Sequence, residues 1–144
     1  MVSYSFIING EPVGEVVPSR GLRQGDAISP YLFVICAEFL SRQFAIVEDG
    51  DEFQGVRVCT GAPAISHLFF TDESFVFFKA EERGCRKVGS ILSRYETLSG
   101  QQVSLAKSEI AFSRNVPRWK QDELTAVLGV KRVEKHKKYL GLPT

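Results

Sequence analysis

The chain has 144 residues, of which 44% are hydrophobic and 24% are charged, so it fits one domain with a modest core and is not compositionally disordered. The net charge of +1 gives no overall attraction to nucleic acid. The charge is uneven: residues 1–72 carry 4 Lys and Arg against 9 Asp and Glu, and residues 73–144 carry 14 against 8. A basic half of this kind could lie on phosphates, although a solvated helical surface is the plainer explanation.

The cysteines argue against a zinc site and against a disulfide framework. Cys36, Cys59 and Cys85 are odd in number, widely spaced and free of any CxxC pair. No signal-peptide pattern opens the chain, and the longest apolar run, residues 32–37, is too short to span a bilayer. We therefore expect a soluble, intracellular protein without a membrane partner.

The first predicted element is a β-hairpin over residues 3–17. Residues 4–8 are mostly apolar and meet Asn9-Gly10, a pair that favours the positive-φ turn of a two-residue hairpin. Residues 13–17 then return as the second strand.

A loop and a helix are expected over residues 18–47. Ser29 suits a helix N-cap and Pro30 the first helical position, so the helix should run from Pro30 to about Val47. Its first turns are apolar nearly all round, which predicts burial.

A second hairpin is expected over residues 65–79. A short strand at 56–59 precedes it, and two apolar strands at 65–70 and 75–79 flank the polar residues 71–74. This pattern predicts a hairpin with acidic residues at its tip.

The next predicted element is a helix that begins at Glu81-Glu82, because negative charge there meets the positive end of the helix dipole. The apolar positions of this helix are Cys85, Val88, Ile91, Leu92, Tyr95 and Leu98. Gly100 stands where a C-terminal glycine is favoured.

Short strands are expected at 103–105 and 109–112, and a last helix at 117–128 ends before Gly129. The order of elements indicates an α+β fold, an antiparallel sheet with helices on one face. The whole chain is predicted to form one domain, 1–144, with segments at 1–17, 18–47, 65–79, 81–113 and a basic segment at 114–144.

The tip of the second hairpin is the first candidate site. Asp72 and Glu73 lie between apolar strands, where carboxylates cost desolvation energy unless a cation binds them. Paired oxygen ligands of this kind suit Mg²⁺. The alternative is an ordinary polar turn in solvent.

The loop from Gly21 to Asp26 is the second candidate site. Its glycines allow close approach of the backbone to a ligand, and Arg23 and Gln24 can bond phosphate, sugar or base edges. A loop that only turns the chain into the helix is the alternative.

Four segments in chain order share motifs with one family: PSRGLRQGDAISPYLF (18–33), SHLFFTDESFVFF (66–78), LSGQQVSLAKSEIAFS (98–113) and YLGLP (139–143). In order, they resemble the helix-entry motif, the catalytic hairpin, the lysine-serine segment and the palm-closing motif of reverse transcriptases from LINE-type, non-LTR retrotransposons. The first motif is highly specific, and the resemblance covers nearly the whole chain. It implies a polymerase palm domain and an RNA-directed DNA polymerase.

The resemblance implies the catalytic roles. Such polymerases transfer nucleotides with two metal ions, and Asp72 and Glu73 match the family's metal-binding aspartates, so Mg²⁺ is the implied cofactor. Lys107 matches a lysine that acts as general acid toward pyrophosphate or as a charge near it. A plain surface lysine is the alternative for Lys107.

The resemblance also implies binding roles. Gln24 and Gly25 match residues lining the nucleotide and template pocket, and Arg20 and Arg23 would face phosphates. The implied partners are an RNA template, a DNA primer and dNTP, and the implied location is nuclear; the oligomeric state stays open.

Aromatic and histidine residues complete the expectations. Phe69 and Phe70 would pack beneath the hairpin. His67 and His136 are assigned no role and are expected at polar surface positions.

Three departures from the family weaken the catalytic expectation. The family supplies another metal-binding aspartate upstream, whereas residues 2–10 hold no acid, so the palm would lack its first catalytic strand. Glu73 replaces aspartate and moves the carboxylate by roughly an ångström, which Mg²⁺ tolerates poorly. Thr71 replaces alanine and Ala27 replaces proline. We expect a fragment that is inactive alone.

The missing strand also bears on stability. Its loss should leave sheet edges unpaired and apolar faces uncovered, so we expect a marginally stable or aggregation-prone fragment. A cooperative thermal transition without ANS binding would contradict this.

Two other functions stay open: a nucleic-acid-binding module acting through the basic half, and an unrelated α+β interaction protein.

Overall fold

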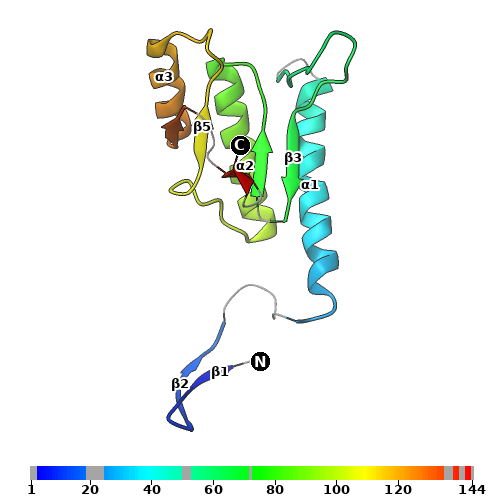
Figure 1. Ribbon diagram of the computed structural model, residues 1–144. Helices are drawn as coiled ribbons and strands as arrows, with labels where there is room; N and C mark the ends of the chain where they lie inside the picture. The colour runs from blue at the N-terminus through cyan, green and yellow to red at the C-terminus, as the bar shows by residue number, and fades with distance from the viewer. Residues whose placement is uncertain are drawn as a thin grey trace.

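The computed structural model describes residues 3–18, 25–49, 53–71, 73–134, 138–139 and 142–143. The helices lie on one side of the strands β3, β4 and β5 (Figure 1), which confirms the α+β class. The elements in order are β1 (Tyr4–Ile8), β2 (Glu11–Val16), α1 (Ser29–Asp49), β3 (His67–Phe70), β4 (Glu73–Val76), α2 (Glu82–Ser99), β5 (Glu109–Ala111), α3 (Arg118–Leu128), β6 (Lys131–Val133), β7 (Lys138–Tyr139) and β8 (Leu142–Pro143).

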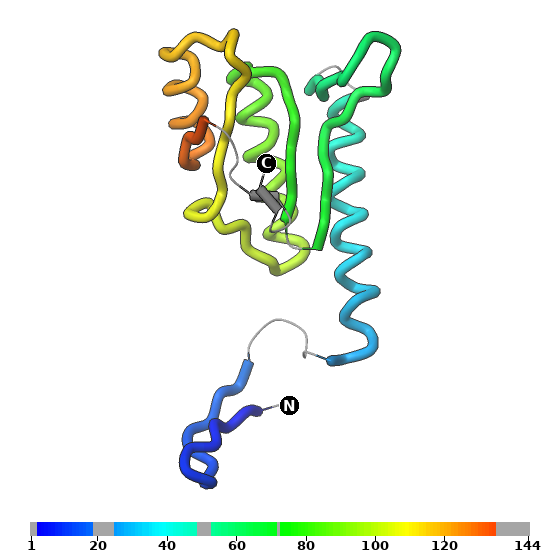
Figure 2. Tube along the Cα trace, viewed as in Figure 1, coloured from blue at the N-terminus to red at the C-terminus, as the bar shows by residue number. Residues whose placement is uncertain are grey.

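The predicted N-terminal hairpin is confirmed. Asn9 and Gly10 both have positive φ, 53° and 87°, as a tight two-residue turn requires. The return strand therefore starts at Glu11, opposite Ile8, and not at Val13. Every residue of β1 and β2 is exposed, and the hairpin lies apart from the helices (Figure 2).

Helix α1 begins where the sequence predicts, but its burial is lower than expected. The Asp26 carbonyl accepts the Ser29 N–H at 3.1 Å, and the Asp26 carboxylate accepts the Ile28 N–H at 3.1 Å. Among the described residues of the chain, none before Leu40 is buried. The prediction that the first turns are buried is therefore wrong, because no described element covers them.

By length and composition alone, α1 could cross a membrane over residues 29–48. This differs from the expectation drawn from the short run at 32–37, because Glu38 and Arg42 interrupt a segment that is apolar on average. Core helices meet the same criteria, and the second half of α1 does contribute Leu40 and Phe44 to the protein core.

Strands β3 and β4 form the second predicted hairpin. Their antiparallel register pairs His67 with Val76 and Phe70 with Glu73, so the turn is shorter than predicted. The predicted strand at 56–59 is reduced to one antiparallel bridge between Val56 and Ile65.

Both later helices end as predicted. Gly100 and Gly129 have φ of 70° and 67°, and their N–H groups bond back to Glu96 and Thr125. The strand predicted at 103–105 is wrong, since that segment forms a turn.

The described strands pair in twos. β5 runs parallel to β6, with α3 as the crossover between them, while the other strand pairs are antiparallel. A parallel pair needs such a crossover, which the 19 residues between Ala111 and Lys131 supply.

One hydrophobic cluster joins α1, α2 and the β3–β4 hairpin. Phe44 packs against Phe53 with ring centroids 5.8 Å apart, and Phe53 stacks on Phe78 at 5.5 Å. The buried members are Leu40, Phe44, Phe53, Val88, Ile91 and Tyr95. Cys85 is also buried, and burial raises the pKa of its thiol to about 11, so it is an unreactive residue of the core.

Candidate catalytic hairpin

The turn of the β3–β4 hairpin holds its first residue in an unusual conformation. Thr71 has φ 49°, a left-handed conformation that is unfavourable for a β-branched residue. Such strain is stored where the surrounding strands hold it, and it occurs often at functional sites. The turn therefore combines backbone strain with the acidic pair that the sequence singled out.

Of the two predicted metal ligands, the structure describes one. Glu73 is the first residue of β4 and is exposed, and Asp72 lies outside the described residues. Within the described part of the chain, no three His, Cys, Asp or Glu residues gather into a group that could hold a metal ion. The oxygen donors of this turn match Mg²⁺ in chemical type, and they would need a further ligand to complete a site.

The aromatic residues below the turn divide between two faces. Phe69 packs against the core, with its ring centroid 6.4 Å from that of Phe44, as predicted. Phe70 is 52% exposed, so its predicted packing is wrong. Successive strand residues point to opposite faces, and Phe70 falls on the open one.

His67 is half-buried, which corrects its expected surface position. Its Nε2 lies 2.8 Å from the Ser41 hydroxyl and its Nδ1 3.0 Å from the Ser66 hydroxyl. Its ring stacks on Phe44 at 5.5 Å. Burial lowers the pKa of His67, and nearby Glu48 partly offsets this.

This histidine ties the catalytic-type hairpin to α1, and sequence reasoning missed it. The available signal was alternation along the strand, which places His67 on the same inward face as Phe69.

Lys107 lies in the turn before β5. Its backbone N–H bonds to the Ser104 carbonyl at 3.0 Å, and the Ser108 hydroxyl bonds to the same carbonyl at 2.9 Å, so the turn is locally fixed. The Lys107 side chain is exposed. The α2–β5 loop and the β3–β4 turn lie toward the same end of the strand layer (Figure 1).

Gly25 is the described member of the predicted nucleotide-binding set. Its φ of 83° is one that glycine adopts without strain, and a Cβ there would meet no atom within 4 Å. The start of α1 also lies toward the end of the molecule that carries the β3–β4 turn (Figure 1). Arg20, Arg23 and Gln24 lie outside the described residues.

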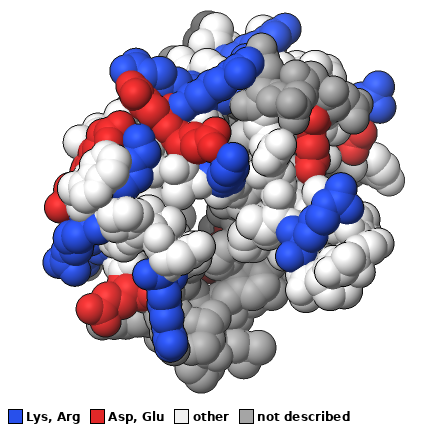
Figure 3. Space-filling model, turned by 90° about the horizontal axis from the view of Figure 1, so that it is seen from above, with Lys and Arg blue, Asp and Glu red and all other residues white. Residues whose placement is uncertain are grey.

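Charge on the top of the molecule is mixed. Figure 3 shows basic and acidic side chains interleaved on that face, with no continuous surface of one sign among the coloured residues. Oppositely charged neighbours also pair elsewhere in the described chain, since Lys120 bonds Glu123 at 3.0 Å and Arg132 bonds Asp122.

Comparison with known proteins identifies the family. The family model for reverse transcriptase (RNA-dependent DNA polymerase) matches residues 1–144. An uncharacterised mitochondrial protein of Arabidopsis thaliana is 51% identical over 69 residues, which cover 48% of this chain and 57% of that protein. The match thus spans just over half the length of that curated relative. No solved structure matches the chain.

The family match covers all the segments on which the resemblance was based. A reverse transcriptase domain works in general on nucleic-acid template and primer with dNTP, and the family uses divalent metal ions. This chain belongs to the reverse transcriptase (RNA-dependent DNA polymerase) family.

Proposed function

We propose that this chain is part of the palm of a reverse transcriptase from a LINE-type, non-LTR retrotransposon. The subclass rests on the helix-entry motif at residues 18–33, which is the most specific of the four sequence motifs. The observation that carries the polymerase assignment is the tight β3–β4 hairpin, whose strained turn precedes Glu73.

The proposed metal site lies at this turn. Asp72 and Glu73 would hold Mg²⁺, which when bound would stabilise the attacking oxygen and the leaving pyrophosphate. Glu73 is exposed at the start of β4, as a ligand shared with substrate must be.

The binding residues are proposed around the same end of the molecule. Lys107 would place a positive charge or a proton near the pyrophosphate. Arg20 and Arg23 would contact phosphates, while Gln24 and Gly25 would line the nucleotide and template pocket. The open space beside the Gly25 backbone, where a Cβ would meet no atom within 4 Å, supports this.

We further propose that the chain of 144 residues does not polymerise by itself. Its first acidic residue is Glu11, so no carboxylate is available from the segment before β2 to complete the metal site. Glu73 adds a methylene where the family has aspartate, which displaces the second ligand.

Primer extension tests this proposal. The chain is mixed with an RNA template, an annealed DNA primer, dNTP and Mg²⁺ or Mn²⁺, and we expect no extension above the Asp72→Asn control. Robust extension that Asp72→Asn abolishes would overturn the inactivity and retain the catalytic hairpin. Robust extension that survives Asp72→Asn would overturn the metal assignment.

We also propose a cellular location for the protein. The resemblance implies the nucleus, whereas the Arabidopsis relative is named as a mitochondrial protein. Fractionation of cells expressing the tagged full-length protein distinguishes the two, and we propose the nuclear fraction.

A further inference from the structure

The outer side of helix α1 carries a mostly apolar stripe that no described residue of the chain covers. Tyr31 is 71% exposed and Ile35 is 63% exposed. At 3.6 residues per turn the stripe occupies an arc of about 120° around the helix axis, and it is about 22 Å long. This α1 outer stripe consists of Tyr31, Val34, Ile35, Glu38, Arg42, Ala45 and Ile46, which are all exposed.

The stripe lies opposite the side of α1 that joins the protein core. The buried residues Leu40 and Phe44 lie about 140–180° around the helix axis from the middle of the stripe. Helix α1 stands at the edge of the described fold, with β3 and α2 on one side of it (Figure 1). A second body can therefore lie along the stripe without displacing a described element.

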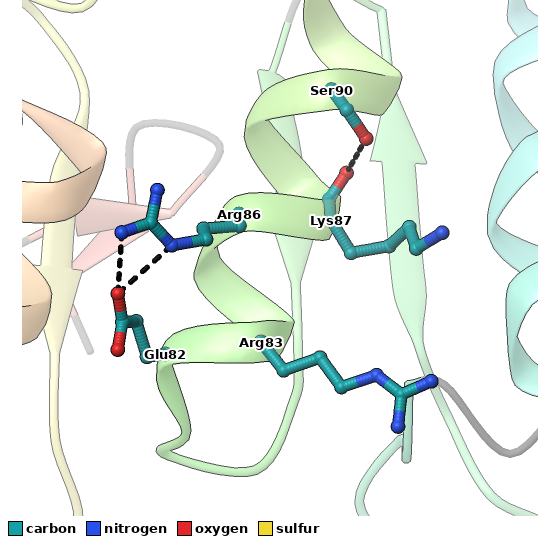
Figure 4. Close-up of a pocket in the computed structure, with 5 residues that line it drawn as sticks. All are labelled: Glu82, Arg83, Arg86, Lys87 and Ser90. Atoms are coloured by element: carbon teal, nitrogen blue, oxygen red, sulfur yellow. Dashed lines mark hydrogen bonds and ion pairs between the residues drawn. The ribbon is translucent and has the colours of Figure 1, made fainter.

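Two opposite charges stand at the centre of the stripe. Glu38 and Arg42 are four residues apart, the same spacing as Glu82 and Arg86 on α2. On α2 this pair closes within the helix, and Arg86 bonds the Glu82 carboxylate at 2.8 and 2.5 Å (Figure 4). Among the described residues, no such ion pair joins Glu38 to Arg42. Both charges therefore remain available to a second body on the stripe.

A second copy of α1, packed antiparallel about a two-fold axis, complements the stripe. With the axis midway between Glu38 and Arg42, Glu38 of each copy lies level with Arg42 of the other. The small Ala45 then lies level with Ile35 of the other copy, which lets the two helices approach closely. In a parallel pair each residue would face its own counterpart, and Glu38 would repel Glu38.

The same charges disfavour a lipid bilayer as the occupant. Helix α1 passes a membrane-span criterion of length and composition, but a charged group at the bilayer centre is costly. A helix that lies on a membrane keeps its charges away from the lipid, whereas Glu38 and Arg42 lie in the middle of the stripe. The opposite side of α1 is already in the protein core.

We propose that the α1 outer stripe is a self-association surface on which a second copy of this chain packs antiparallel. The apolar residues supply the affinity as they leave water. The two Glu38–Arg42 pairs fix the register, because exposed ion pairs add little affinity of their own. One helix face is small for a protein interface, so we expect a dissociation constant on the order of 10–100 µM. The inference goes beyond the proposed polymerase function, since it involves neither a metal ion nor a nucleotide.

Sedimentation equilibrium of the whole chain between about 5 and 300 µM tests the proposal. We expect an equilibrium between monomer and dimer that saturates at the dimer. Glu38→Arg and Arg42→Glu each place like charges opposite one another in both pairs, so each should weaken the dimer roughly tenfold or more.

The mixture of these two single variants is the sharpest part of the test. In a heterodimer of Glu38→Arg with Arg42→Glu, the opposed side chains again carry opposite charges, so the mixture should associate within about threefold of the parent. The double variant E38R/R42E restores opposite charges in the same way and should also dimerise. Ile35→Ser gives an independent reading, and it should weaken the dimer about fivefold or more because it removes an apolar contact.

Arg94→Glu on α2 is the matched control, because it reverses one exposed positive charge as Arg42→Glu does. We expect it to change the dissociation constant by less than about twofold. Circular dichroism checks that each variant stays folded. Equal weakening by Arg94→Glu and Arg42→Glu, or single variants that fail to associate when mixed, would overturn the proposal.

Three results for the parent chain would also overturn it. The first is a monomer at the highest concentration, and the second is open-ended growth in mass without a dimer plateau. The third is flotation with phosphatidylcholine vesicles without self-association, which would assign the stripe to lipid. These measurements use no template, nucleotide or metal ion, so they and the primer-extension assay fail separately.

Discussion

The two halves of helix α1 lie in different surroundings although both are apolar. In the first half, Tyr31 is 71% exposed and Val34 63% exposed, and the β1–β2 hairpin before it is exposed throughout. In the second half, Phe44 is fully buried between Phe53, His67 and Phe69. Burial is therefore decided by whether a partner element is present, and not by the hydrophobicity of the helix.

This contrast explains why marginal stability is expected. The core draws on α1, α2 and the β3–β4 hairpin, while large apolar side chains of the N-terminal region remain in water. Exposed apolar surface of this extent favours association or aggregation.

The largest expected difference comes from truncating one apolar side chain in each half of α1. Phe44→Ala should destabilise by about 3–5 kcal/mol, because it removes a buried ring and leaves a cavity. Val34→Ala should change stability by less than about 0.5 kcal/mol. Urea denaturation followed by circular dichroism measures both; similar losses would show that the first half of α1 is packed in solution.

A second comparison uses one half-buried glycine, Gly55, and one exposed glycine, Gly89. A Cβ at Gly55 would lie 2.7 Å from the Ile65 carbonyl oxygen and 2.8 Å from the Glu48 carboxylate, whereas one at Gly89 would meet open space. Gly55→Ala should therefore cost about 1–3 kcal/mol. Gly89→Ala should add about 0.5–1 kcal/mol of stability. A neutral Gly55→Ala would mean that the Val56–Ile65 bridge does not form.

Thr71 tests whether the turn stores strain. Thr71→Gly should stabilise the chain by about 1 kcal/mol, since glycine adopts φ near 50° without the clash of a β-branched side chain. Thermal melts of the variant and the parent measure this. A lower melting temperature for Thr71→Gly would show that the Thr71 side chain contributes more than its backbone costs.

The smallest expected effect is a pH dependence from His67. Because its pKa is lowered in the folded chain, its contribution is fully present above the unfolded value of 6.5 and decreases as the pH falls below it. The urea midpoint should drop between pH 7.5 and roughly pH 5.5, and His67→Gln should reduce that drop. An identical drop in His67→Gln would assign it to other groups.

Turn and cap residues made much of the fold predictable. Asn9-Gly10 located the first hairpin, and Gly100 and Gly129 located two helix ends, because their positive φ values depend on local chemistry alone. Thr71 shows the limit, since its conformation is imposed by the pairing of Phe70 with Glu73.

Features that depend on distant partners were harder to predict. The apolar start of α1 predicted burial, but a helix is buried only where another element covers it. The parallel pairing of β5 with β6 likewise depends on the crossover through α3. The acidic pair was found from its place between two apolar strands, and the family motif then gave it a catalytic role. Lys107 was found from the family motif alone, because nothing in its local pattern distinguishes it from other surface charges.

Metal binding at the β3–β4 turn is the central claim, and Mn²⁺ titration followed by amide NMR tests it most directly. The account predicts that signals of residues 70–76 broaden first, that signals of the β1–β2 hairpin persist, and that Asp72→Asn with Glu73→Gln removes the effect. Broadening centred elsewhere, or unchanged in that double variant, would contradict it.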